Sequence, residues 1–164
     1  HMDALIWRLE VIDAAQTSFI SSLGWTERIV HVDALATICR MNEVDSANTI
    51  IKVGERVQAG WKAGAAAAGL EINVTGLPAI SAFGFKHDNP LALKTLVVQE
   101  MLKRGFLATV AFYASVAHTD EVIDQYLANM HEEFGMIGEI VKKGDDPTQY
   151  LEGPVSHGGF KRVT

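Results

Sequence analysis

Cysteine is almost absent from this sequence of 164 residues, with Cys39 as the only example. A lone cysteine excludes an intrachain disulfide and fits a reducing compartment. No apolar run approaches the roughly 20 residues that cross a bilayer, and the N-terminus lacks the pattern of a signal peptide. These absences predict a cytoplasmic protein with no membrane segment.

Clusters of basic residues are also missing. The chain has 14 Lys and Arg against 20 Asp and Glu, a formal net charge of −6 and a pI near 5.4. This balance argues against a nucleic-acid-binding or anionic-membrane surface. Glycine-rich loops of the dinucleotide or P-loop kind are absent too, which removes the usual nucleotide-binding motifs.

What the sequence does have is enough apolar material for one folded domain. Hydrophobic residues make up 48% and charged residues 21% of the chain, which excludes disorder over most of its length. We expect a single domain over residues 3–144 and an irregular tail over 145–164, where glycine and proline recur. Residues 1–2, His-Met, resemble a tag or cloning remnant.

A strand–helix–strand unit lies at the centre of the predicted fold. The apolar run Ala79–Phe85 predicts a strand, and Asn89 is placed to cap a helix over Pro90–Arg104 that has proline at its first position. Gly105 is placed to end this helix. The run Phe106–Phe112 predicts a second strand in the same sheet.

The remaining pattern predicts three more helices and one more strand. A helix from Trp25 carries an apolar stripe that includes Cys39, and Asp45 is placed to cap a second helix that ends at Gly69. A strand over Leu70–Val74 precedes a connection over Thr75–Pro78, and a last helix runs from a Thr119 cap to about Lys143. The predicted fold class is α+β: a small, mostly antiparallel sheet in two layers with helices on one side.

Candidate catalytic or metal-binding residues are few, and none stands in a specific motif. Ser115 and His118 have the types of a nucleophile and a base, but a loop histidine that bonds nearby backbone is the better interpretation. His87 with Asp88 suggests a metal ligand pair, and a turn before the helix cap is again the better interpretation.

For three further groups of residues we expect a structural role rather than a chemical one. Cys39 lies on the apolar stripe of its helix, which predicts a core thiol rather than a nucleophile. His31 is expected to be a partly exposed helix residue. His131 with Glu132 and Glu133 lacks the spacing of a zinc-binding helix, so a solvated helix face is expected. We therefore assign no metal ligand and no catalytic residue.

Several segments in order resemble a known enzyme family. They resemble the C-terminal part of class III pyridoxal-phosphate (PLP) aminotransferases, most of all the glutamate-1-semialdehyde aminotransferase (aminomutase) group. The similarity covers about residues 4–143. The segments are Val11–Gln16, Phe19–Ser22, Trp25–Ile29, Leu91–Thr95, Gln99–Gly105, Ala111–Ser115 and Ala117–Thr119.

The resemblance implies a fold-type-I enzyme that works as a dimer and catalyses transamination or amino-group transfer with PLP. In that family, the Schiff-base lysine lies shortly before the segment matched here by Val11–Gln16, and no lysine of this chain, Lys52 included, has that context. We therefore expect the isolated chain to bind PLP unstably and to be inactive. Ser21 and Ser22 correspond to a segment that reaches the cofactor phosphate of the partner subunit. Leu23 and Gly24 depart from the family's usual hydroxyl and aromatic residues.

Two classes of function remain open. One is the parent enzyme's transamination or amino-group migration with PLP. The other, which the missing lysine favours, is a non-catalytic domain that binds a partner or itself. A bridging alternative is that a separate polypeptide supplies the large PLP-binding domain. A homodimer is expected, held by apolar residues of the N-terminal stretch. These residues are Leu5, Ile6, Trp7, Leu9 and Val11, with Phe19 and Trp25 extending the surface.

Overall fold

The computed structural model describes residues 28–157, and the chain divides into two compact units, His1–Ala47 and Asn48–Thr164. In the first unit, helix α3 spans Arg28–Glu43. Val32, Leu35 and Cys39 are exposed on it. The prediction of a buried stripe with a core thiol is therefore wrong, because helical spacing identifies a face of a helix but not whether another element covers it.

Helix α4 spans Ser46–Ala67 and supplies one wall of the core. Asp45, directly before it, has a positive φ of 45°. The buried residues recur every three or four positions, as one face of a helix requires; they are Gly54, Val57, Trp61, Gly64 and Ala65. Gly69 follows with a φ of 70°, a left-handed conformation that glycine adopts without strain and that suits the predicted end of this helix.

The sheet has three antiparallel strands in the order β1-β2-β3. Strand β1 (Ile72–Leu77) and strand β2 (Ile80–Phe85) form a hairpin with only residues 78 and 79 between them. The predicted connection over Thr75–Pro78 is therefore misplaced. Thr75, Gly76 and Leu77 continue the ladder, because Gln58 of α4 donates to both the Gly76 carbonyl and Ser81 Oγ and holds the end of the hairpin.

Strand β3 is shorter than the sequence predicts, spanning Ala111–Tyr113 rather than Phe106–Phe112. The chain leaves helix α5 in a turn at Gly105 and Phe106, where the predicted strand would begin. Gly105 has a φ of 84°, and the Phe106 N–H donates to the Met101 carbonyl at 2.9 Å. The pairing of β3 with β2 begins after this turn, at Ala111, which lies opposite Ala82.

Both remaining helices begin and end close to their predicted bounds. Helix α5 spans Pro90–Lys103, with Asn89 Oδ1 accepting the Ala92 N–H at its N-terminus. Helix α6 spans Asp120–Lys143, with Thr119 as its N-cap and Gly144, at φ 75°, as its C-cap. Acidic residues in the first turn of α6 and lysines in its last turn match the helix dipole.

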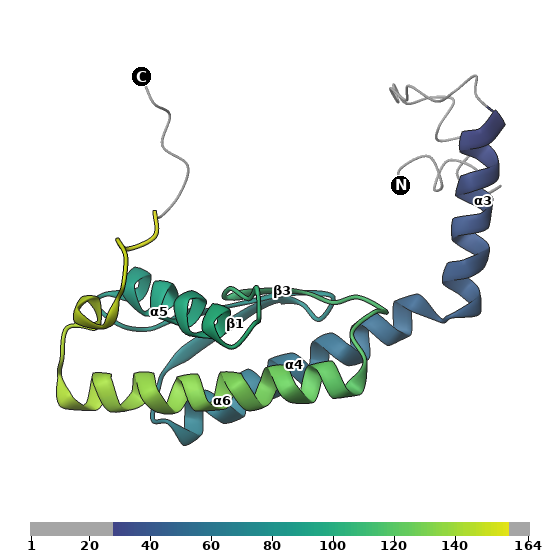
Figure 1. The fold of residues 1–164 in the computed structure, drawn as a ribbon. Helices are drawn as coiled ribbons and strands as arrows, with labels where there is room; N and C mark the ends of the chain where they lie inside the picture. The colour runs from purple at the N-terminus through teal and green to yellow at the C-terminus, as the bar shows by residue number, and fades with distance from the viewer. Residues whose placement is uncertain (1–27, 158–164) are drawn as a thin grey trace, which may run out of the picture. The chain divides into compact units, whose positions relative to one another are not determined.

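The core lies between the helices and one face of the sheet (Figure 1). Ser81, Phe83 and Phe85 alternate inward along β2, and Phe83 packs against Trp61 with ring centroids 4.8 Å apart. Side chains of α4, α5 and α6 complete the cluster. The described residues thus form an α+β fold with a small antiparallel sheet, as predicted.

Residues after α6 are held against α5. A 3-10 helix, η2, spans Pro147–Tyr150 and contacts α5. Farther along, the Ser156 N–H donates to Thr95 Oγ1 at 3.0 Å, so the described part of the tail is irregular but attached. None of the described helices combines the length and apolar character that crossing a membrane requires.

Candidate functional site

A cleft of about 300 Å³ lies beside β3, where the chain passes from α5 to α6. It is formed by the segment that follows α5, by His118 in the loop before α6, and by the first two turns of α6. Its lining residues are Phe106, Leu107, Ala108, Thr109, Ala111, Phe112, Tyr113, His118, Val122, Ile123 and Tyr126. None of them is Lys, Arg, Asp, Glu, Ser or Cys.

Three ring side chains of the lining, Phe112, His118 and Tyr126, pack against one another. The Phe112 ring centroid lies 5.0 Å from that of His118 and 5.8 Å from that of Tyr126. The Tyr126 hydroxyl accepts a hydrogen bond from Trp61 Nε1 at 3.0 Å. Burial raises the pKa of Tyr126 to about 12, although the bond from Trp61 opposes the shift. Tyr126 is therefore a neutral phenol at physiological pH.

His118 is fixed by the loop that carries it. Its Nδ1 accepts the Ser115 N–H at 3.1 Å, so the neutral ring carries its proton on Nε2. Ser115 Oγ accepts the Ala117 N–H at 3.2 Å and makes no hydrogen bond to the imidazole. The interpretation of His118 as a loop histidine that bonds nearby backbone is confirmed, and the two residues are not arranged as nucleophile and base.

The lining of the cleft is mostly aromatic and aliphatic. Of the side chains that serve as enzyme nucleophiles, the cleft has no Ser, Cys, Lys, Asp or Glu and does have Thr109, Tyr113, His118 and Tyr126. For general acid–base work the cleft offers the imidazole of His118, with no carboxylate lining the cleft beside it. A neutral, aromatic surface of this kind suits an apolar group of a ligand or of a partner protein.

A second hollow of about 210 Å³ lies near His87. His87 Nδ1 accepts the Asn89 N–H at 3.0 Å, which makes the segment before α5 a turn, as predicted. The hollow is also lined by Lys86 and Glu71, whose charged groups lie 3.7 Å apart. Between residues 28 and 157, no three His, Cys, Asp or Glu side chains gather as a metal site.

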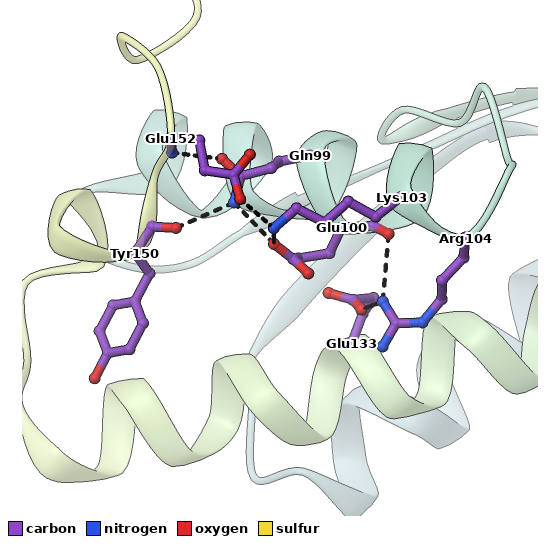
Figure 2. Close-up of polar contacts among 7 residues, drawn as sticks. All are labelled: Gln99, Glu100, Lys103, Arg104, Glu133, Tyr150 and Glu152. Carbon is purple, nitrogen blue, oxygen red and sulfur yellow. Dashed lines mark hydrogen bonds and ion pairs between the residues drawn. The ribbon is translucent and has the colours of Figure 1, made fainter.

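A polar network joins the end of α5 to the tail (Figure 2). Gln99 donates to the Tyr150 carbonyl at 3.1 Å and accepts the Glu152 N–H at 2.7 Å. Lys103 Nζ lies 2.6 Å from Glu100 and 2.8 Å from Glu152. Burial alone would raise the pKa of Glu100, but hydrogen bonds from Gln99 and Lys103 outweigh it and the pKa lies below its usual value. The bonds to Glu100 and Glu152 raise the pKa of Lys103.

One acidic residue of this region is fully buried. Glu133 of α6 accepts a hydrogen bond at Oε1 from Arg104 Nη1, as Figure 2 shows, and its Oε2 has no partner in the described part of the chain. Glu132 is exposed and lies 3.6 Å from Arg104 Nη2. The predicted solvated face is therefore wrong for Glu133. Helical spacing carried the signal, since Glu133 follows Met130 by three positions and precedes Ile137 by four.

The predicted cofactor contacts, Ser21 and Ser22, lie outside the described residues, as does the N-terminal apolar stretch around Trp7. His131 is exposed, and its Nε2 lies 2.9 Å from the Gly60 carbonyl. Of His31 only the backbone, within α3, is described. No described lysine is buried; these are Lys52, Lys62, Lys86, Lys94, Lys103, Lys142 and Lys143.

Comparison with known proteins gives a likeness of fold. No protein-family model matches the chain, and no curated protein sequence matches it. Among solved structures, the PLP internal aldimine form of the FumI protein of Sphingopyxis sp. MTA144 matches with a TM-score of 0.65 and 22% sequence identity. The match covers 87% of this chain and 34% of that one. This chain therefore shares the fold of about a third of a PLP-binding protein.

Proposed function

We propose that this chain is the C-terminal small domain of a PLP-dependent class III aminotransferase, of the glutamate-1-semialdehyde aminotransferase (aminomutase) group. The parent enzyme moves an amino group with the help of PLP. The observation that carries the proposal is the match of 87% of this chain to 34% of the FumI chain, whose structure holds PLP as an internal aldimine. The segments between Leu91 and Thr119 that resemble class III aminotransferases, in the same order along the chain, support the narrower assignment to that class.

The described residues do not fit the cofactor. PLP needs a lysine amine held in a desolvated site where its pKa falls, and no described lysine is buried. The cleft beside β3 contains no amine for the aldehyde of PLP and no carboxylate for its pyridine nitrogen. We therefore assign this chain no catalytic residue. Its contribution to a PLP site would come from Ser21 and Ser22, which would bind the cofactor phosphate of a partner subunit.

The function of such a chain is to bind another protein surface. In one form of the proposal, a separate large domain supplies the lysine and the pyridine-pairing aspartate, and this chain completes the enzyme. In the other form, the chain associates with a second copy of itself and has no catalytic role. The uncharged cleft beside β3 favours a role in binding in either form, because an apolar surface of this kind suits contact with protein.

Titration with PLP tests the proposal for the chain alone. We expect no internal-aldimine absorbance band, and no stoichiometric labelling of one lysine after borohydride reduction and peptide mass spectrometry. Free lysine at the same concentration serves as the control for surface imine formation. Specific labelling of a single lysine would overturn the non-catalytic role.

A further inference from the structure

Three polar side chains follow one another along one face of α5. Thr95, Gln99 and Lys103 are four positions apart, a spacing that makes side chains neighbours on the surface of a helix. Each of the three bonds to the segment of chain that comes after η2. We call these three residues the polar track and call residues 150–157 the strap.

The polar track holds the strap largely by its backbone. Gln99 donates from Nε2 to the Tyr150 carbonyl at 3.1 Å and accepts the Glu152 N–H at Oε1 at 2.7 Å (Figure 2). Thr95 Oγ1 accepts the Ser156 N–H at 3.0 Å. A carbonyl and two N–H groups of the strap are therefore satisfied by side chains of α5. Main-chain bonds of this kind are how proteins bind extended peptides.

Two side chains of the strap add selectivity to this contact. Leu151 has an extended backbone, with φ −85° and ψ 137°, and its half-buried side chain packs against the core. Glu152 directly follows, and its carboxylate lies 2.8 Å from Lys103 Nζ. The polar track thus receives an extended segment in which an apolar residue is followed directly by an acidic one.

The strap is held lightly compared with the helix beneath it. Every residue from 150 to 157 is at least partly exposed, and the ion pair between Lys103 and Glu152 is 44% and 72% exposed. Pro147 in η2 is buried and gives the strap a fixed point, whereas α5 itself buries Leu93 and Leu96 completely. A segment with little buried apolar surface and exposed hydrogen bonds opens at a lower free energy than the core.

We propose that the polar track is a binding site for an extended peptide, and that the strap occupies it as a tethered ligand. The strap opens by local unfolding while α5 and the core stay folded. A peptide from another molecule gains the site only when the strap leaves it, because the tether gives the strap a high effective concentration. The partner that fits carries an apolar residue followed by an acidic one, as Leu151 and Glu152 do. The proposal goes beyond the aminotransferase assignment and uses no residue assigned to the cofactor.

Hydrogen exchange of the full chain, measured by mass spectrometry in dilute urea, tests the local opening. We expect amides of the strap to exchange at least about tenfold faster than those in the middle of α6. Gln99→Met should speed exchange in the strap at least about fivefold, because two hydrogen bonds are lost, and should leave α6 unchanged. Gln125→Met is the matched control, since Gln125 is an exposed glutamine of α6.

A peptide of residues 148–157, labelled with fluorescein, tests the site itself. Glu152→Pro removes the N–H that Gln99 accepts and leaves the polar track intact. Leu151 already has backbone angles that suit the residue before a proline. We expect the peptide to bind the Glu152→Pro chain at least about tenfold more tightly than the unaltered chain, because the strap no longer competes. Adding Gln99→Met to Glu152→Pro should abolish that gain. Fluorescence anisotropy measures all three affinities.

Two kinds of result overturn the proposal. Amides of the strap that exchange as slowly as those of α6 would show that the strap leaves only when the whole fold opens, and amides that exchange like an unprotected peptide would show that it is not bound. Equal affinity of the peptide for all three chains, or no binding to any, would remove the polar track as a peptide site. Unchanged exchange in α6 verifies that each variant is folded. Neither experiment involves PLP, so failure here and failure of the proposed function are distinguishable.

Discussion

Gly54 of α4 lies against the carbonyl of Pro78 at the tip of the β1–β2 hairpin, so close that a Cβ on residue 54 would stand 1.7 Å from that oxygen. The contact brings the helix backbone directly onto the hairpin. Gln58, one turn later, donates to Ser81 Oγ at 2.7 Å. The position of the hairpin on α4 thus depends on the absence of a side chain at residue 54.

Gly54→Ala is expected to lower the free energy of unfolding by at least about 1–3 kcal/mol, because the added methyl overpacks a contact made by backbone. Gly135→Ala is the matched control. Gly135 also lies inside a helix, but its added Cβ would meet no atom within 4 Å, so a gain of about 0.5–1 kcal/mol is expected from helix propensity. Urea denaturation followed by tryptophan fluorescence measures both, and equal effects would contradict the close contact.

Leu96→Ala is expected to cost about 2–5 kcal/mol, because Leu96 is fully buried between α5 and the core and truncation leaves a cavity. Leu102→Ala, on the exposed side of the same helix, should change stability by less than about 0.5 kcal/mol. The difference in denaturation midpoint between the two variants measures this burial. Similar midpoints would show that α5 does not pack by this face.

Arg104→Met is expected to destabilise the fold by about 3–5 kcal/mol, because it leaves the buried Glu133 carboxylate without its partner. The double variant Arg104→Met/Glu133→Leu should recover most of that loss, since no charge is then buried. Lys103→Met, which removes an exposed ion pair, should cost less than about 1 kcal/mol. A double variant no more stable than Arg104→Met would argue against the pair as the cause.

Stability should fall as the pH rises from about 10 to 12 because of Tyr126. Its pKa is raised to about 12 in the folded chain and lies near 10 when unfolded. The folded state therefore holds the phenol proton over this window after the unfolded state has lost it, and stability that is complete below pH 10 is lost by up to about 2–3 kcal/mol.

Tyr126→Phe provides the control for that pH dependence. The variant loses the bond from Trp61 and is less stable at neutral pH, but it lacks the titrating group. The stability difference between the parent chain and Tyr126→Phe should therefore narrow between pH 10 and 12, whichever other tyrosines and lysines titrate there. A constant difference across the window would mean that Tyr126 ionises as easily in the folded chain as in the unfolded one.

The sequence determined the elements whose signals are local. Asn89 and Pro90 start α5, Thr119 starts α6, and Gly144 ends it, because caps depend on residues within one turn of the helix end. The α+β class followed from the order of these elements. The backbone bonding of His118 and the turn at His87 were likewise predicted from local sequence.

Only the tertiary structure decided which side chains on these helices are buried. Local pattern predicted a buried thiol at Cys39 and a solvated side chain at Glu133. In the structure the thiol is exposed and the Glu133 side chain is buried. Burial depends on whether a distant element packs on that face, and Arg104, at the end of another helix, supplies the charged partner of the buried Glu133 side chain.

The same reason decides which side chains the outward face of the sheet carries. Strand register is set by turn position, and Gln58 on α4 places the hairpin turn at residues 78 and 79. A turn displaced by one residue would send Ile80 inward and Ser81 outward, because side chains alternate along a strand. The exposure of Ile80 on the outward face of the sheet therefore depends on a contact between Gln58 of a helix and Ser81 of the hairpin, 23 positions apart in sequence. Local pattern alone does not specify that contact.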